Sequence, residues 1–271
     1  MPELPEVETT LRGLSPHLAG RSVTAVDVRQ PRLREPVPVD LATRLSGSAL
    51  QAIERRGKYL CFLFDHGALL IHLGMSGSLR IVPPDQPPSG HDHVDIAFGD
   101  RVLRFRDPRR FGLVQWYDPR QGDPPRLARL GIEPLSAAFD GSWLYRATRG
   151  LGLPIKSFLM DGHRIVGVGN IYASESLFRA RVHPLMPARR LGPRRGQRLA
   201  SAIREVLAEA IAAGGSTLRD FTGGDGRPGY FQHSHAVYGR EGEACPCCAA
   251  PIRRIVLAQR STFLCTRCQR C

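Results

Sequence analysis

Lysine is scarce in this chain, and long hydrophobic runs are absent. Among the 271 residues only two are lysine, Lys58 and Lys156, whereas 36 are arginine. The longest apolar run, residues 59–64, is far shorter than the roughly 18 residues that a membrane helix needs. The N-terminal segment is acidic and lacks the apolar core of a secretory signal. We therefore expect a cytoplasmic protein that does not enter a membrane.

Positive charge dominates the composition. Lysine and arginine together number 38 against 25 acidic residues, which gives a formal net charge of +13. A surplus of this size favours a polyanionic partner, and nucleic acid is the usual one. Arginine binds phosphate through paired hydrogen bonds and cannot accept a proton near neutral pH. A codon preference for arginine would explain the same count, and the two lysines that remain would then be the informative residues.

The hydrophobic pattern changes from strands to helices along the chain. Residues 2–15 carry apolar side chains at helical spacing, with prolines and glutamates in the first turns. The short strands that follow have the spacing of an antiparallel sandwich or barrel. They include residues 23–28, 59–64, 68–73, 94–98, 102–106 and 113–117. Helical periodicity returns at 155–160, 171–179 and 193–213, and Gly214-Gly215 predicts the end of the last helix.

These changes divide the chain into four parts. Residues 1–120 are expected to form a β domain, and the proline- and glycine-rich stretch 121–150 a linker with a short helix. Residues 151–235 are expected to form a helical domain that includes a glycine-rich loop. Residues 236–271 form a small cysteine-rich module.

The cysteines are concentrated at the C-terminal end and have the spacing of a metal site. Two Cys-x2-Cys pairs, Cys245 with Cys248 and Cys265 with Cys268, are separated by sixteen residues. Four thiolates at this spacing fit a tetrahedral zinc ion on two knuckles, and they leave no open position for catalysis. We therefore expect one structural Zn²⁺. Cys268 with Cys271 is an alternative second pair, which we disfavour because Cys271 is the terminal residue.

The segment between the two cysteine pairs predicts a hairpin. Its residues form two apolar stretches on either side of a tight turn near 258–260. This turn would place Arg260 at the tip, where it could contact a phosphate or a groove of a nucleic acid.

The N-terminus offers a second kind of chemistry. If Met1 is removed, Pro2 becomes the first residue and carries a secondary amine. An α-amino group has a pKa of about 7.7–8.0, so a useful fraction is neutral and nucleophilic near pH 7. Attack of this amine on a sugar C1′ gives an iminium directly, and Glu3 beside it could donate or accept the proton.

Several segments, in order along the whole chain, resemble bacterial formamidopyrimidine-DNA glycosylases. They are residues 1–9 (MPELPEVET), 57–59 (GKY), 72–77 (HLGMSG), 91–95 (HDHVD), 107–112 (DPRRFG), 167–173 (GVGNIYA) and 259–263 (QRSTF). The resemblance implies a base-excision repair enzyme that removes 8-oxoguanine and formamidopyrimidines from damaged double-stranded DNA. It implies cleavage of the abasic site by β,δ-elimination, and a monomer that meets DNA in the bacterial nucleoid.

The resemblance also implies an α+β fold and roles for individual residues. The fold is an N-terminal β-sandwich with flanking helices, then a helix–two-turn–helix domain with a four-cysteine zinc finger. Pro2 would be the Schiff-base nucleophile, and Glu3 the acid/base that opens the sugar ring. Lys58 would assist elimination near the lesion. Arg260, with Asn170, would hold the phosphate of the flipped nucleotide.

Further residues match positions that contact DNA in the family. These are His91, Arg109, Asn170, Met75 and Phe111. An enzyme that acts on a base must take it out of the stack, and Met75, Arg109 and Phe111 would fill the gap that the base leaves. The loop 217–234 would close over the damaged base, and Glu6 and Glu175 match acidic positions that line the site.

Two other functions fit parts of the pattern. An endonuclease VIII-type enzyme, which prefers oxidised pyrimidines, is the closer one. Leu4 after Pro2-Glu3, together with the wedge residues, favours the purine branch. A noncatalytic zinc-finger DNA-binding paralogue is the other, but such a protein would typically lack Pro2, Glu3 or Lys58, and all three are present.

Overall fold

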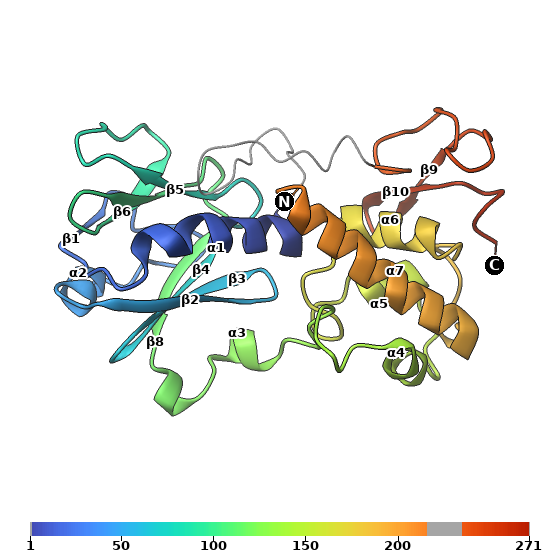
Figure 1. The fold of residues 1–271 in the computed structure, drawn as a ribbon, viewed down its shortest axis with the longest axis horizontal. Coiled ribbons are helices and arrows are strands. Elements are labelled where there is room, and N and C mark those ends of the chain that lie inside the picture. The colour runs from blue at the N-terminus through green and yellow to red at the C-terminus, as the bar shows by residue number, and fades with distance from the viewer. Residues whose placement is uncertain (1, 216–234, 271) are drawn as a thin grey trace. The chain divides into compact units, whose positions relative to one another are not determined.

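The computed structural model describes residues 2–215 and 235–270, and these residues form two compact units (Figure 1). Unit 1 contains residues 2–128 and 213–215, and unit 2 contains residues 129–212 and 235–270. Residues 216–234, which include the whole of the expected capping loop 217–234, lie outside the described part of the chain. Within the described part, no helix combines the length and the apolar composition that crossing a membrane requires.

Unit 1 is a sandwich of two four-stranded antiparallel sheets that share one hydrophobic core. One sheet has the order β1 (Ala25–Val28), β6 (Asp92–Ala97), β7 (Val102–Arg106) and β5 (Ser78–Val82). The other has the order β2 (Leu50–Arg56), β3 (Tyr59–Phe64), β4 (Gly67–His72) and β8 (Leu113–Tyr117). Alternate residues of the strands, such as Leu60 and Phe62 of β3 or Leu103 and Phe105 of β7, point into the core. The predicted β-sandwich is confirmed.

Helices flank this sandwich. The first, α1 (Leu4–Leu18), buries the apolar stripe Leu4, Val7, Leu14 and Leu18 and packs against β2. It continues past the predicted end at residue 15 even though it contains Pro16. Proline removes the hydrogen bond to the carbonyl four residues earlier, but here that carbonyl belongs to the exposed Arg12, where water can replace the bond. The short helices α2 (Leu41–Leu45), η1 (Pro119–Gln121) and α3 (Pro125–Ala128) complete the unit.

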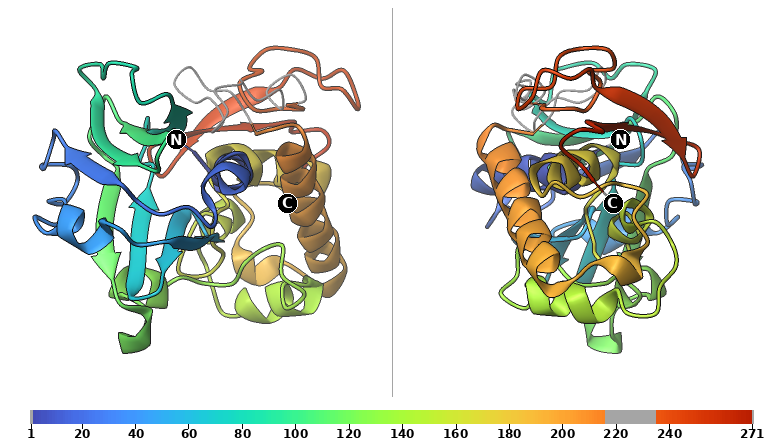
Figure 2. Two further views of the ribbon diagram at one scale, coloured as in Figure 1. Left: turned by 60° about the vertical axis from the view of Figure 1, so that its left-hand side comes forward. Right: turned by 90° about the vertical axis from the view of Figure 1, so that its right-hand side faces the viewer.

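Unit 2 is built around a long helix, α7 (Pro193–Ala212), which packs against α4 (Gly141–Ala147) and α6 (Asn170–Arg179). Figure 2 shows α7 beside α6 in both views. The helices α5 (Ile155–Leu159) and η2 (Ala188–Arg190) lie in the same unit. The buried face of α7 includes Leu199, Ile203 and Val206 at helical spacing. Gly214 and Gly215 follow the helix with φ values of 77° and 81°, so the pair ends α7 as predicted.

The C-terminal module of unit 2 contains a two-stranded hairpin. Its strands are β9 (Arg253–Leu257) and β10 (Arg260–Leu264), and they pair in antiparallel register from Arg260 opposite Leu257. The two turn residues, Ala258 and Gln259, have φ values of 46° and 59°. Two successive residues with positive φ make the tight turn whose twist matches that of the strands. The hairpin and the place of Arg260 beside its turn are therefore as the sequence predicts.

A buried arginine fixes the segment that leads into β6. Arg104 in β7 is 5% exposed and donates hydrogen bonds of 2.9 and 2.8 Å to the two carboxylate oxygens of Asp95. The same guanidinium donates to the backbone carbonyls of Gln86 and Pro87. Because a buried guanidinium must find acceptors, the loop before His91 is held to the sheet through this side chain.

We expect Arg104→Met to lower the free energy of unfolding by about 1–3 kcal/mol, because Asp95 and the carbonyls of Gln86 and Pro87 lose their shared donor while Arg29 still pairs with Asp95. Urea denaturation followed by circular dichroism measures the change. Arg44→Ala is the matched control, since its ion pair with Asp40 is exposed and should matter little. Equal losses in the two variants would contradict the role given to Arg104.

Candidate active site and metal centre

The predicted nucleophile and its acid lie at the beginning of α1. Pro2 is buried, and Glu3, which is 3% exposed, is the N-cap residue of the helix. The backbone N–H of Glu3 donates to a carboxylate oxygen of Glu6 at 2.8 Å. Glu6 is also 3% exposed. Two shielded carboxyl groups therefore lie within one helical turn of Pro2, where they can serve as proton donor and acceptor.

Lys58 lies in the tight turn between β2 and β3, next to Gly57, whose φ is +58°. Arg55 in β2 donates to the carbonyl of Gly57 at 3.0 Å and pairs with Glu8 of α1 at 2.8 Å. Both side chains of this pair are largely shielded from solvent. Burial acts to raise the pKa of Glu8, but hydrogen bonds from Arg55 and Arg12 outweigh it and lower the pKa below its ordinary value. One ion pair thus connects the turn that carries Lys58 with α1, the helix whose N-cap residue is Glu3.

His72, at the end of β4, lies near the same turn. Its ring packs on Tyr59 with the centroids 4.8 Å apart, and its Nδ1 accepts a hydrogen bond of 2.9 Å from the backbone N–H of Gly74. Burial, and then the positive charges of Lys58 and Arg34, lower the pKa of His72 from 6.5 to about 4. The ring is therefore neutral near pH 7, with Nδ1 as its acceptor nitrogen.

The three predicted wedge residues lie on two neighbouring loops of unit 1. Met75 is 41% exposed in the loop between β4 and β5, and Phe111 is 45% exposed in the loop between β7 and β8. The Arg109 guanidinium lies 5.2 Å from the centre of the Phe111 ring. At Gly74, which has φ +63°, a Cβ would lie 2.5 Å from the backbone of Phe111. Glycine at this position lets the two loops approach, so the structure brings the wedge residues together.

His91 is exposed and joins the same surface through the backbone. Its carbonyl accepts a hydrogen bond of 3.0 Å from the N–H of Asp107, the residue that begins the loop with Arg109 and Phe111. All four predicted DNA contacts of unit 1 therefore belong to segments that are directly bonded or in contact.

In unit 2, a buried lysine joins the first turn of α6 to the C-terminal hairpin. Lys156 is 1% exposed, and its Nζ donates to Asn170 Oδ1 at 2.7 Å and to Thr262 Oγ1 at 2.8 Å. The amide nitrogen of Asn170 donates in turn to the carbonyl of Ser261 at 2.9 Å. The sequence assigned no role to Lys156. Its contacts show that it holds Asn170 against the strand that Arg260 begins.

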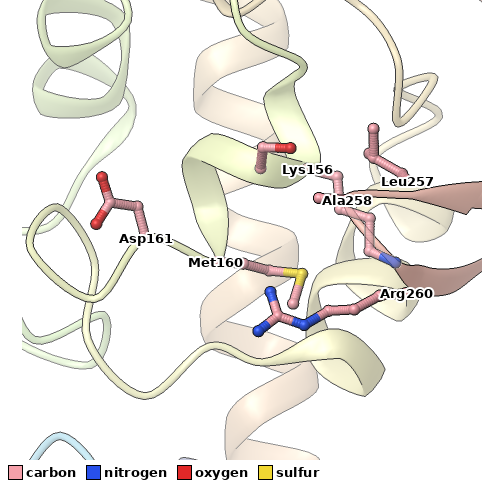
Figure 3. A pocket seen from close by; sticks show the side chains of 7 residues that line it. Lys156, Met160, Asp161, Leu257, Ala258 and Arg260 are labelled. Carbon is pink, nitrogen blue, oxygen red and sulfur yellow. The ribbon is translucent and has the colours of Figure 1, made fainter.

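Arg260 and Lys156 line a cavity of about 220 Å³ between α5 and the hairpin (Figure 3). Met160, Leu257 and Ala258 contribute to its wall. In the close-up, the Arg260 side chain extends toward Met160, while Asp161 points away from the arginine. Arg260 lies at the turn end of the hairpin, where its guanidinium can meet a phosphate.

Glu175 does not present its carboxylate to solvent. It lies in α6, is 5% exposed, and accepts hydrogen bonds from the backbone N–H groups of Ala236, Val237 and Tyr238 at 2.9, 3.0 and 2.7 Å. Burial raises the pKa of Glu175, although these three donors favour the charged form. Its place in the structure is that of a tie between α6 and the chain that enters the zinc module.

The four predicted cysteine ligands converge. The Sγ atoms of Cys245, Cys248, Cys265 and Cys268 all lie within 4.8 Å of one another. The distance is 3.9 Å between Cys245 and Cys268 and 3.4 Å between Cys248 and Cys265. Zinc–sulfur bonds of about 2.3 Å in a tetrahedron require sulfur atoms roughly 3.8 Å apart, so the thiolates fit one structural Zn²⁺. Cys247 is exposed, and Cys271 lies outside the described residues.

Comparisons with known proteins agree with this arrangement. Family models match residues 1–114 (formamidopyrimidine-DNA glycosylase N-terminal domain), 130–222 (its H2TH domain) and 242–270 (zinc finger found in FPG and IleRS). A formamidopyrimidine-DNA glycosylase of Aromatoleum aromaticum is 63% identical over 270 residues and covers 100% of both chains.

Solved structures agree as well. The MutM (FPG) protein of Thermus thermophilus is 43% identical, with a TM-score of 0.88 over 99% of this chain and 98% of that one. A Lactococcus lactis FPG mutant in complex with DNA containing Fapy-dG is 35% identical, with a TM-score of 0.92 over 99% of each chain. Other structures of Lactococcus FPG hold abasic-site DNA and oxidised-pyrimidine DNA.

The matched sandwich, H2TH domain and zinc finger define a DNA glycosylase. The chain belongs to the formamidopyrimidine-DNA glycosylase family, as its motifs led us to expect. It is therefore a base-excision repair enzyme with glycosylase and abasic-site lyase activities.

Sequence reasoning did not identify the residues that hold this site together. These residues are Glu8 and Arg55, which form an ion pair, His72, whose Nδ1 accepts a hydrogen bond, and Asp107, whose carboxylate accepts one from Ser76. His72 and Asp107 lie inside recognised motifs, which was the available signal. Glu8 and Arg55 are separated by many residues, and no local pattern pairs them.

We expect Cys265→Ser to reduce the zinc content from one ion per chain to nearly none, because it removes one of four thiolates. Zinc is measured by mass spectrometry of the purified protein. Cys247→Ser is the matched control, since Cys247 is exposed and outside the cluster, and it should keep the ion. If Cys265→Ser retained a full zinc ion, the alternative pair Cys268 and Cys271 would be the correct one.

The neutral state of His72 predicts a loss of stability in mild acid. The folded-state pKa of about 4 lies below the ordinary 6.5, so the unfolded chain takes up the proton first as the pH falls. The stability that the low pKa of His72 contributes is fully present above pH 6.5. By pH 5 the free energy of unfolding is lower by about 2 kcal/mol. Urea denaturation measures the free energy of unfolding at pH 7.5 and at pH 5, and we expect His72→Gln to reduce the difference between the two values by this amount. An unchanged difference would contradict the assignment.

Proposed function

We propose that the enzyme excises 8-oxoguanine and formamidopyrimidines from duplex DNA through a Schiff base on Pro2, and then cleaves the strand by β,δ-elimination. The observation that carries this proposal is the buried Pro2-Glu3 pair at the start of α1, tied through Glu8 and Arg55 to the turn with Lys58. This arrangement brings together a shielded acid, a cation and Pro2, whose nitrogen becomes the N-terminal amine once Met1 is removed, on adjoining elements of one unit.

The chemistry follows from these groups. Once Met1 is removed, the Pro2 nitrogen attacks C1′ while the bond from C1′ to the damaged base breaks, and the base leaves with the proton that the amine loses. Glu3 protonates the ring oxygen as the sugar opens, which gives an iminium ion. The iminium makes a C2′ proton acidic, and loss of that proton expels the 3′ phosphate; a second elimination expels the 5′ phosphate. Lys58 stabilises the negative charge near the lesion.

Residues of unit 2 would bind the phosphates of the DNA backbone. Arg260 would bind a phosphate beside the flipped nucleotide through paired hydrogen bonds. Asn170 is the first residue of α6, and the positive end of a helix dipole also favours a phosphate. On unit 1, His91 would contact the strand, and Met75, Arg109 and Phe111 would occupy the space of the extruded base.

A second candidate function, excision of oxidised pyrimidines, differs from the first only in the lesions that the enzyme removes. Solved structures of the related Lactococcus protein include both a Fapy-dG complex and an oxidised-pyrimidine complex. Leu4 and the three wedge residues favour oxidised purines as the main substrates, and the second complex supports oxidised pyrimidines as additional ones. We also propose that a single copy of the chain acts on damaged DNA in the bacterial cytoplasm.

We expect borohydride to trap the wild-type enzyme on a duplex that contains 8-oxoguanine opposite cytosine, because reduction fixes an iminium intermediate. Pro2→Gly should lose the adduct, since the constrained secondary amine is replaced by a flexible primary one. Gel electrophoresis of the cross-linked species measures the yield. Pro5→Ala is the matched control, because it alters the same helical turn and keeps the Pro2 amine.

Two outcomes would overturn the mechanism. One is a wild-type protein that binds the duplex but neither traps nor nicks it. The other is equal trapping by Pro2→Gly and wild type. A duplex with an oxidised pyrimidine, run beside the 8-oxoguanine duplex, tests the lesion range: faster excision of the pyrimidine would favour the endonuclease VIII-type activity.

A further inference from the structure

A fully buried carboxylate lies beneath the two wedge loops of unit 1. Asp107 is 0% exposed. Its Oδ1 accepts hydrogen bonds from the hydroxyl of Ser76 at 2.8 Å and from the backbone N–H of Arg109 at 3.2 Å. Its Oδ2 accepts a hydrogen bond of 2.7 Å from the backbone N–H of Gly112. One side chain therefore bonds to the loop that carries Met75 and to both ends of the loop that carries Phe111.

The backbone of Asp107 bonds to the third DNA-facing segment. Its N–H donates to the carbonyl of His91 at 3.0 Å, and its carbonyl accepts a hydrogen bond of 2.8 Å from the ring of the buried His93. The same carbonyl accepts from the N–H of Arg110, which has φ +56°. A non-glycine residue adopts this conformation only where the surroundings require it, so the turn after Asp107 is held in one shape.

The space around this carboxylate is closed. A Cβ on Gly112 would lie 2.5 Å from the Phe105 ring and 3.0 Å from the Asp107 carboxylate. A Cβ on Gly77, next to Ser76, would lie 2.2 Å from the carbonyl of Leu73. Because the loops have no room to shift independently, the hydrogen bonds of Asp107 determine their relative positions.

We propose that Asp107 is a positioning residue that holds Met75, Arg109 and Phe111 in one fixed arrangement, so that they enter the duplex together as the damaged base leaves. This inference rests on the proposed function, in which these three residues fill the gap. Asp107 touches no reacting atom. It acts through the loops, and its loss should therefore affect the steps that need the wedge and spare the steps that do not.

The variant that tests this is Asp107→Asn. Asparagine has the same shape, but only one of its two terminal atoms accepts hydrogen bonds. Its amide group would face either the backbone N–H of Gly112 or, beside the Ser76 hydroxyl, the backbone N–H of Arg109. The hydroxyl can turn to accept, but a backbone N–H cannot, so in either orientation two donors are opposed in a buried site. The loop that carries Arg109 and Phe111 must then move relative to the loop that carries Met75.

We expect Asp107→Asn to lower single-turnover excision of 8-oxoguanine from a duplex by about tenfold or more. Cleavage of a preformed abasic site in a single-stranded oligonucleotide, which has no stack or opposite base to fill, should fall by less than about twofold. In a Phe111→Ala background the duplex effect of Asp107→Asn should shrink to about threefold or less, because the part it positions is gone. Ser76→Ala should cause a smaller loss of the same kind, about threefold.

Asp118→Asn is the matched control, since Asp118 caps η1 and bonds to Arg120 away from the wedge loops. It should leave the ratio of the two activities unchanged. Equal loss on both substrates in Asp107→Asn, or additive effects with Phe111→Ala, would overturn the proposal. If Asp107→Asn does not fold, the ratio measured for Ser76→Ala decides the question. A wild-type enzyme that cleaves neither substrate would instead contradict the proposed function.

Discussion

The ion pair between Glu8 and Arg55 is the contact on which the arrangement of the proposed catalytic residues in unit 1 depends. It connects α1, whose N-cap residue is Glu3, to the turn that presents Lys58. Because both side chains are largely shielded, salt screens the attraction only weakly. Arg55 also binds the carbonyl of Gly57, so a single guanidinium sets both the shape of the turn and its attachment to α1.

Shielded charged side chains fix three other segments that have few apolar side chains of their own. Arg104 holds the loop before His91, Lys156 holds the first turn of α6 to the hairpin, and Glu175 holds the chain that enters the zinc module. Loops with few apolar side chains gain little from burial, so hydrogen bonds must hold them in place. A buried charge enforces this geometry because leaving any of its hydrogen bonds unformed costs free energy.

The sequence predicted features that depend on local spacing. The Cys-x2-Cys spacing predicts the four zinc ligands Cys245, Cys248, Cys265 and Cys268. The short turn between two apolar stretches predicts that Arg260 lies at the tip of the hairpin. Hydrophobic period predicts most of the strands and the helices α1, α5, α6 and α7, but β2, β5 and α4 lie outside the predicted ranges. Lys156 could not be interpreted, because its partner Thr262 is far along the chain and only the folded structure brings the two together. The contacts of Asp107 are hidden for the same reason.

The scarcity of lysine has a chemical consequence for an enzyme that makes abasic sites. The opened sugar carries an aldehyde, which condenses with amines but not with guanidinium groups under the same conditions. Here the cationic groups that can hold DNA are almost all arginine, and one of the two lysines is buried with its Nζ hydrogen-bonded inside the protein. The enzyme can therefore grip its own reactive product through many positive charges while offering it very few nucleophiles.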